Sequence, residues 1–440
     1  MAKIFDIYLA KQDQPESDAY AKLSLPATPC QIQDAFDKLR LAEGESLYWE
    51  ITEYHHFEEL SSLLNDTCGL NDLNALAQKL SELDERQFTA FAGLLKMEQQ
   101  KGEAIPISRL IDLAYSTECC HVVDEALNDG QLGRFYVENE FVPEIDGLPE
   151  KALALLDYEQ IGRNMRRDEG GVFVERSIDH PGGYVVQHDD LVEAYKTLDL
   201  TPKAPDYTIL LEVSKGFFND PGYDSGKTVQ LKLPVLSETL DAALESVEAW
   251  DWREVGWNCL DCRIPALTER ISDAEEGIDF LNQMAQRLTD MEPKALSAYK
   301  ALLEAMNCRD LQSAGALMDS LDQYIFSPQY SSPIEVAKGE LSLILCEPDA
   351  ATLAPHLNLY QYGQALIEKC GGVLTPYGLI EPRGPHMSPA ERVMWGAEEQ
   401  GSERSFRLQA ETEVNGLCDD AGQPVQAIEA QPRQGGMEMK

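Results

Sequence analysis

The chain has 440 residues, with 77 acidic side chains against 36 lysines and arginines, so its formal net charge is -41 at pH 7. A content of 43% hydrophobic residues excludes a wholly disordered chain, and the length exceeds what one hydrophobic core usually serves. The charge excludes nucleic acid and anionic membranes as direct partners and favours basic protein surfaces, such as those of proteins that themselves hold DNA.

The predicted elements begin with strands at residues 4–9 and 21–25, a helix at 29–41 and a third strand at 47–54. Two helices follow, because two groups of apolar residues have helical spacing with a break between them. These groups are Leu73, Leu76, Ala77 and Leu80, and then Phe88, Phe91, Leu94 and Leu95. Asp84 is predicted to cap the second helix, since its carboxylate can accept from free backbone N–H groups. Further helices and a mixed α and β end are expected after it.

The sequence contains an internal repeat. Residues 73–80 match residues 281–288 at an offset of 208, with five of eight positions identical, and the same offset places Trp49 over Trp257. We therefore predict two diverged copies, residues 1–190 and 205–382, joined by a linker at 191–204. Residues 383–440 contain many prolines and glycines and few large apolar residues, and we expect a disordered tail there.

The location of the protein is predicted from its start and its apolar runs. The first residues lack the basic and apolar regions of a signal peptide, and no run of 18 apolar residues occurs. Ten cysteines are scattered sparsely, which is typical of reduced thiols and implies no disulfide framework. We expect a soluble, cytoplasmic protein.

Three short motifs have a structural interpretation that is better than the chemical one. Residues 222–228 resemble a phosphate-binding loop, but a strand-like segment follows where a helix is needed, so a hairpin turn is preferred. Cys259 and Cys262 have the spacing of half a zinc site, yet they align with Ile51 and Tyr54, which favours buried thiols on a strand.

His55 and His56 lack metalloprotease spacing and are interpreted as surface residues. No hydrolase elbow or dinucleotide fingerprint occurs, and a catalytic pair cannot be chosen among so many carboxylates. We therefore predict that the protein is not an enzyme, with no catalytic residue, no metal and no cofactor.

Three segments of copy one resemble the ArdA antirestriction family. They are residues 47–54 (LYWEITEY), residues 129–138 (DGQLGRFYVE), and residues 157–163 (DYEQIGR) followed by 169–173 (EGGVF). In copy two, residues 321–328 (LDQYIFSP) resemble the stretch that leads into the family's antirestriction motif. Copy two also departs from the family, because Lys338-Gly339-Glu340 stands in place of Leu132-Gly133-Arg134 and Gln364 in place of Arg163.

The resemblance implies an α+β fold, in which small α+β and helical subdomains form an elongated acidic chain, here as two tandem ArdA-like copies. It implies a DNA mimic that occupies the DNA-binding groove of Type I restriction-modification enzymes, at the methyltransferase core, and so protects a mobile genetic element. The family works as a homodimer, so we expect one chain to act as a pseudo-dimer in which the copies replace two subunits, although a homodimer stays possible. The alternative is an acidic adaptor or regulator of a mobile element that binds another basic DNA-processing or defence protein.

Two sets of residues are predicted to carry this function. The acidic side chains expected to imitate phosphates are Asp124, Glu125, Asp129, Glu138, Glu140, Asp157, Glu159, Asp168 and Glu169. The residues of the family motif, which the resemblance associates with the contact between copies, are Leu132, Gly133, Arg134, Phe135, Tyr136, Tyr324 and Phe326. For Leu132, Phe135 and Tyr136, packing in a core is favoured over direct contact with a target.

Overall fold

The structure is a computed structural model, and it describes residues 2–13, 18–41, 45–64, 68–145, 147, 149–153, 155–177, 180–201, 204–216, 227–308 and 310–383. Within these residues, helices accompany four three-stranded antiparallel sheets, which confirms the predicted α+β class. The tail predicted beyond residue 383 lies outside the described residues. We refer to residues 2–201 as the first half and to residues 204–383 as the second half.

The first half opens with a sheet of strand order β2-β1-β3 and one helix. Its elements are β1 (Phe5–Lys11), β2 (Tyr20–Leu25), α1 (Pro29–Leu39) and β3 (Leu47–Tyr54). Alternate residues of β1 are buried, as expected for a sheet with one face in a core. Thr28 and Gln31 form a capping box at the start of α1. The helix ends at Leu39, two residues before the predicted end, and Arg40 follows it in the left-handed conformation (φ 54°).

Three helices and a second sheet, of strand order β4-β6-β5, continue the first half. The elements are α2 (Leu70–Leu80), α3 (Glu85–Gln99), α4 (Ile107–Tyr115), β4 (Cys120–Val123), α5 (Asp129–Glu138), α6 (Glu150–Leu153), α7 (Tyr158–Glu169), β5 (Val172–Val174) and β6 (Gly183–Gln187). The predicted cap is present, because the Asp84 carboxylate accepts a hydrogen bond from the Gln87 N–H at 2.8 Å.

The second half has sheets of order β8-β7-β9 and β10-β12-β11. Its elements are β7 (Ile209–Lys215), β8 (Thr228–Leu233), α8 (Ser237–Ser246), β9 (Val255–Cys262), α9 (Thr268–Ser272), α10 (Ile278–Asp290), α11 (Pro293–Met306), α12 (Leu311–Asp319), β10 (Tyr324–Ser327), α13 (Pro333–Ile344), α14 (Glu347–Leu353), α15 (Leu359–Cys370), β11 (Val373–Thr375) and β12 (Gly378–Pro382).

Strand orders and side-chain contacts recur between the halves. The side-chain amide of Asn74 accepts a hydrogen bond from the Ala27 N–H at 2.7 Å and donates one to the Ala27 carbonyl at 3.0 Å. Asn282 forms the same two bonds with Val235, at 2.8 and 2.9 Å. These asparagines are 208 residues apart, which is the offset of the sequence repeat.

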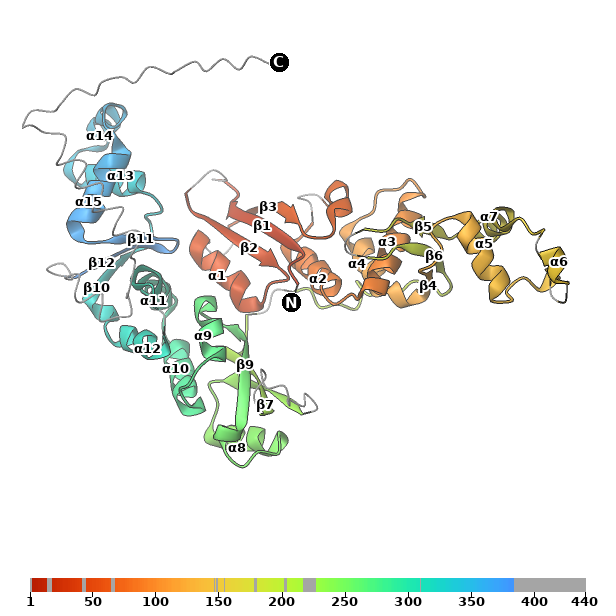
Figure 1. Cartoon of the computed structure of the whole chain (residues 1–440). Helices are drawn as coiled ribbons and strands as arrows, with labels where there is room; N and C mark the ends of the chain where they lie inside the picture. Colours follow the sequence, from red (N-terminus) through yellow and green to blue (C-terminus); the bar gives the residue numbers. More distant parts are fainter. Residues whose placement is uncertain are drawn as a thin grey trace, which may run out of the picture.

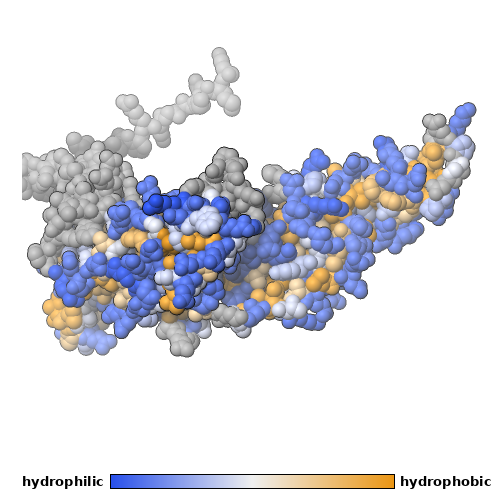
Figure 2. All heavy atoms as spheres, turned by 90° about the horizontal axis from the view of Figure 1, so that it is seen from below, coloured by the Kyte–Doolittle hydropathy of each residue, from blue (hydrophilic) through white to orange (hydrophobic). Residues whose placement is uncertain are grey.

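The first half extends as an arm that ends at α5, α6 and α7, and the second half lies across the base of this arm, next to α1 (Figure 1). Each half has its own main cluster of buried apolar residues. Hydrophilic residues cover much of the face seen from below (Figure 2). None of the helices in the described ranges combines the length and apolar character needed to cross a membrane.

The segment predicted as a linker packs against the first half over its N-terminal part. Tyr195 donates from its N–H to Asp112 at 2.8 Å and from its hydroxyl to Asp72 at 3.0 Å, and Ala194 is buried. The chain therefore leaves the first half only after these contacts.

Candidate protein-binding surface

The acidic residues predicted to imitate phosphates lie within α5 and α7 or next to them in the chain. These two helices lie near the end of the arm (Figure 1). Glycines let the two backbones touch. A Cβ atom on Gly133 would lie 1.9 Å from the carbonyl oxygen of Tyr158, and one on Gly162 would lie 1.8 Å from that of Asp129. Since no larger residue fits at these two contacts, the pair holds its surface side chains on a defined frame.

Local hydrogen bonds fix where each of these helices starts and stops. The carboxylate of Asp157 caps α7 by accepting from the Gln160 N–H at 3.0 Å, and the side chain of Asn128 caps α5 in the same way through Gln131. Gly170 ends α7 with a φ of 72°, which glycine adopts without strain. Asp157 is exposed, but its carboxylate is in part engaged by the helix.

Asp129 joins the two helices. Arg166 of α7 donates from Nε and Nη2 to the Asp129 carboxylate at 2.8 and 3.0 Å. These hydrogen bonds hold the pKa of Asp129 below its ordinary value and raise the pKa of Arg166. Because its charge is paired with Arg166 inside the helix pair, Asp129 is less available to a basic partner than its position in the sequence suggested.

Glu169 is also engaged within the arm. Its carboxylate accepts from the hydroxyl of Tyr136 at 2.6 Å and from that of the fully buried Tyr184 at 3.0 Å. Burial, and then the hydrogen bond to Glu169, raise the pKa of Tyr136, so this tyrosine stays a hydrogen-bond donor. Sequence reasoning did not detect Tyr184 or Arg166, which lie 15 and 37 residues from their carboxylate partners.

The remaining predicted acids are exposed and differ in their partners. Glu159 pairs with Arg163 at 2.5 Å and Asp168 with Arg167 at 3.3 Å, both at the surface, where such pairs contribute little. Four acids have no ion pair or side-chain hydrogen bond to any residue that the structure describes: Asp124, Glu125, Glu138 and Glu140. These four are therefore the most available to a basic partner.

The residues of the family motif pack within their own halves. Leu132 is fully buried with Ala126 and Tyr184, while Phe135 and Tyr136 are partly buried. Arg134 lies over the Tyr158 ring, 5.7 Å from its centroid. In the second half, Tyr324 and Phe326 lie in β10, pair with β12 and join the main apolar cluster.

The hydrogen bonds and ion pairs between the halves are formed elsewhere in the described chain, by α1 and the loop residues beside it, including Asp34, Asp37 and Arg40. A fused symmetric dimer would use the same surface on both halves. Here α1 contacts α11 and β9 of the second half, and α8 has no matching contact in the described residues. In the described residues, the contact between the halves is therefore formed by a different surface of each half.

The structure describes two of the motifs that were given a structural interpretation, the cysteine pair and the histidines. Cys259 and Cys262 are buried in β9 with free thiols. His55 contacts Asp6 at 2.9 Å and Glu53 at 3.6 Å, and these three form the group of possible metal ligands found in the described part of the chain. Their contacts to one another account for the arrangement as a small cluster of polar side chains near the surface.

The phosphate-loop-like segment mostly lies outside the described residues, but β7 and β8 on either side of it pair antiparallel. This pairing agrees with a hairpin connection and not with a strand that leads into a helix.

Sequence reasoning missed a buried lysine, Lys300, which binds Asp34 from the other half at 2.6 Å. A signal was present, because residues 298–303 are otherwise apolar and all six are buried. A single charge inside such a run indicates a buried partner.

Residues 21–180 match the family model of the antirestriction protein ArdA. The match contains all three segments on which the resemblance rests, as well as α5 and α7. No protein in a search of curated proteins matches the chain.

Proposed function

Since residues 21–180 match the family model of the antirestriction protein ArdA, we propose that this chain belongs to that family and inhibits Type I restriction-modification enzymes as a DNA mimic. In this proposal the chain occupies the DNA-binding groove of the methyltransferase core and does so without catalysis. It would act in the cytoplasm on behalf of an incoming mobile element. The family match is the observation that carries the proposal.

The charges at the end of the arm support this mechanism. A groove that binds DNA presents arginines and lysines to phosphates, and carboxylates on a fixed frame can engage the same side chains. The four unpaired acids, Asp124, Glu125, Glu138 and Glu140, lie around α5, whose position is fixed by its glycine contact with α7. The net charge of -41 adds a long-range attraction that accelerates association and weakens with salt.

We also propose that the second half is a diverged ArdA-like copy. Its support is the recurrence of strand orders, the matched contacts of Asn74 and Asn282, and the close helix contact at Gly363. A Cβ atom on Gly363 of α15 would lie 1.7 Å from the Pro333 carbonyl oxygen of α13. Gly162 makes the equivalent close contact between α7 and α5.

One observation favours the alternative of an adaptor for the second half. Its outer helices expose Leu343 (82%), Ile344 (61%) and Tyr360 (54%). At the positions aligned above, the first half has Val137, Glu138 and Glu159, so two of the three are charged. An exposed apolar surface suits a protein partner other than a phosphate-binding groove.

A competition experiment tests the role of the four unpaired acids. Purified Type I enzyme and labelled DNA containing its site are titrated with the wild-type chain and with the variant Asp124→Asn, Glu125→Gln, Glu138→Gln, Glu140→Gln. The matched control removes four exposed acids of the second half, Glu238, Asp241, Glu245 and Glu269. Both variants lose the same net charge, so a difference between them reports position.

We expect the arm variant to need about tenfold more protein, or a larger excess, for half displacement of DNA than the control variant does, because each lost contact removes a few tenths of a kcal/mol or more. Equal weakening of the two variants would mean that only net charge matters. An unchanged arm variant would remove this surface from the binding site.

A further inference from the structure

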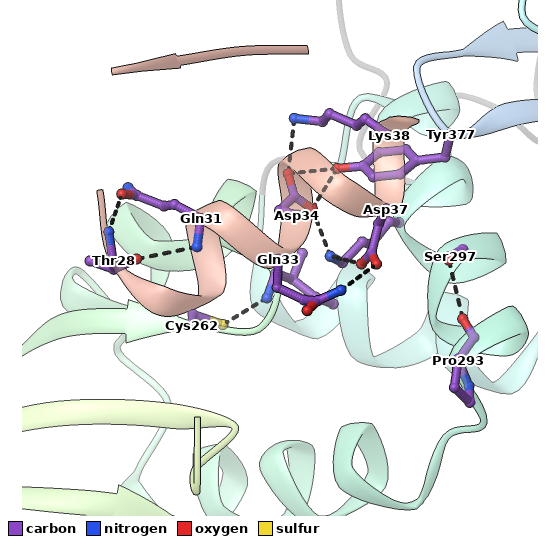
Figure 3. A network of polar contacts seen from close by, with 12 residues as sticks. Thr28, Gln31, Gln33, Asp34, Asp37, Lys38, Cys262, Pro293, Ser297 and Tyr377 are labelled. Carbon is purple, nitrogen blue, oxygen red and sulfur yellow. Dashed lines mark hydrogen bonds and ion pairs between the residues drawn. The ribbon is translucent and has the colours of Figure 1, made fainter. Parts of the chain in front are cut away.

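Helix α1 lies between the two halves of the molecule. One side of it packs in the first half, where Ala35 and Leu39 belong to the apolar cluster. Its other side faces the second half and carries Asp34 and Asp37 (Figure 3). Acidic side chains that point into an interface require partners, because an unpaired buried charge is strongly unfavourable.

Lys300 of α11 supplies the central partner. Its side chain is 1% exposed, and its Nζ lies 2.6 Å from Asp34 Oδ1 and 2.8 Å from Asp37 Oδ2. The hydroxyl of Tyr377 donates to Asp34 at 2.9 Å, and Lys38 contacts the same carboxylate at 2.9 Å (Figure 3). Burial alone would raise the pKa of Asp34, but the charges of Lys300 and Lys38 outweigh it and keep the pKa low.

The N-terminal end of α1 is also bound by the second half. The carboxylate of Asp261 in β9 accepts from the Thr28 hydroxyl at 2.5 Å and from the Cys30 N–H at 3.2 Å. The same carboxylate accepts from the Tyr207 hydroxyl at 2.8 Å. A carboxylate at this end is favourable because the helix dipole is positive there and the first N–H groups lack partners within the helix.

Arg40 binds the second half just after the C-terminal end of α1. Its guanidinium donates to the Ser331 hydroxyl at 2.5 Å and to the carbonyl oxygens of Tyr330 and Tyr377 at 3.2 and 3.1 Å. The helix is thus held at its start, its middle and its end.

The two halves cannot exchange these roles. At the repeat offset of 208, Asp34 corresponds to Ala242, Arg40 to Glu248 and Lys300 to Ala92. Helix α8 therefore lacks counterparts of Asp34 and Arg40, although Glu245 stands at the position of Asp37, and the first half lacks the lysine that would pair with them. Two different surfaces that bind each other can link one chain to the next without end. Here α1 binds the second half of its own chain, so neither surface is left to bind another chain.

We propose that the surface of the second half formed by Lys300, Asp261 and Tyr377 is a dedicated docking site for α1, and that Lys300 keeps the two halves together as one rigid unit. The proposal is independent of the antirestriction function. It concerns the contact that sets the angle between the arm and the second half, and it names a helix of this chain as the occupant.

Cys30 provides a reporter of this contact. Its side chain is 1% exposed, yet it does not belong to the apolar cluster of the first half, and its N–H is bonded to Asp261. Burial, and then the charge of Asp261, raise the pKa of its thiol, so Cys30 should react slowly with alkylating reagents while the halves are docked. Cys120 and Cys308 are buried within the first and second half, respectively, and report unfolding instead.

The test is alkylation of the full-length chain with iodoacetamide, followed by mass spectrometry of the peptides that contain each cysteine. The variant Lys300→Met removes the buried positive charge, so Asp37 loses its ion pair and Asp34 keeps only Lys38 and Tyr377. The matched control is Lys294→Met, an exposed lysine on the same helix. We expect Cys30 to react about 10²-fold faster in Lys300→Met and at the wild-type rate in Lys294→Met, while Cys120 and Cys308 stay protected.

A third variant, Asp34→Asn, Asp37→Asn, Lys300→Met, removes the two carboxylate charges together with the charge of Lys300. If Lys300 acts by neutralising Asp34 and Asp37, Cys30 should react more slowly in this variant than in Lys300→Met, because no carboxylate is left that needs the lysine. Continued protection of Cys30 in Lys300→Met would overturn the proposal. If that variant exposes all three cysteines, the third variant decides: recovered protection of Cys30 supports the docking site, and rapid labelling of Cys30 overturns it.

Discussion

Replacing Gly133 by alanine tests the frame on which the unpaired acids sit. The new Cβ would lie 1.9 Å from the Tyr158 carbonyl oxygen and 2.9 Å from the Gly162 nitrogen, and both are backbone atoms of α7. An ordinary carbon–oxygen contact is longer than 3 Å, so the helices must move apart by more than an ångström. Overpacking of this kind costs about 1–3 kcal/mol.

The control for this prediction is Gly130→Ala on the same helix. A Cβ there would meet only the Asn128 side chain, at 3.4 Å, which is ordinary contact. Alanine is the better helix former by up to about 1 kcal/mol, so this variant should be as stable as the wild type or more stable.

Hydrogen exchange measured by mass spectrometry is the suitable assay, because a chain with several cores does not unfold in one step. Peptides from α5 and α7 should exchange about 10- to 100-fold faster in Gly133→Ala, which corresponds to about 1.4–3 kcal/mol. Peptides from α10 and α11 should be unchanged. If Gly133→Ala exchanges like Gly130→Ala, the reasoning from the backbone contact is refuted.

Three further predictions concern the same helix pairs. Asp129→Asn should weaken the α5–α7 pair by about 1–2 kcal/mol at pH 7, since a charge-assisted pair with a partly exposed arginine is lost. The pKa of Asp129 is lowered in the folded state, so Asp129 stabilises the helix pair fully at a pH above its ordinary pKa. This stabilisation is lost as the pH falls through the lowered pKa. Acid should therefore increase hydrogen exchange in α5 more in the wild type than in this variant. Tyr136→Phe removes a donor to Glu169 and should raise exchange near the end of α7 by about tenfold, a result that Tyr48→Phe, at an exposed pair in β3, should not reproduce. Gly363→Ala should loosen α13 and α15 of the second half while α5 and α7 stay protected, and simultaneous loosening of both pairs would contradict the independence of the two ends.

Local signals predicted the first part of the first half well. The strands at β1 to β3 and the helices α1 to α3 follow the spacing of apolar residues, and the cap at Asp84 follows from its side chain. The end of α1 was misplaced by two residues because Arg40 leaves the helical conformation, where its side chain binds the second half. That departure depends on a contact between residues about 290 positions apart, which periodicity cannot detect.

The acidic surface was predicted in part. Exposure of Asp124, Glu125, Glu138 and Glu140 follows from their polar surroundings. The internal engagement of other acids does not follow, because a carboxylate in a sequence gives no indication of which arginine or tyrosine will reach it. The contact between the halves could not be predicted for the same reason, since Lys300 and Asp34 are 266 residues apart.

The central claim is that this chain competes with DNA for a basic groove. The most direct test titrates the wild-type chain into a complex of Type I enzyme and labelled DNA at 50 and 200 mM salt, concentrations between which contacts to phosphates are known to weaken steeply. We predict displacement of DNA at near-stoichiometric protein at the lower salt and a clear loss of displacement at the higher salt. DNA that stays bound at both concentrations, with excess protein present, would contradict it.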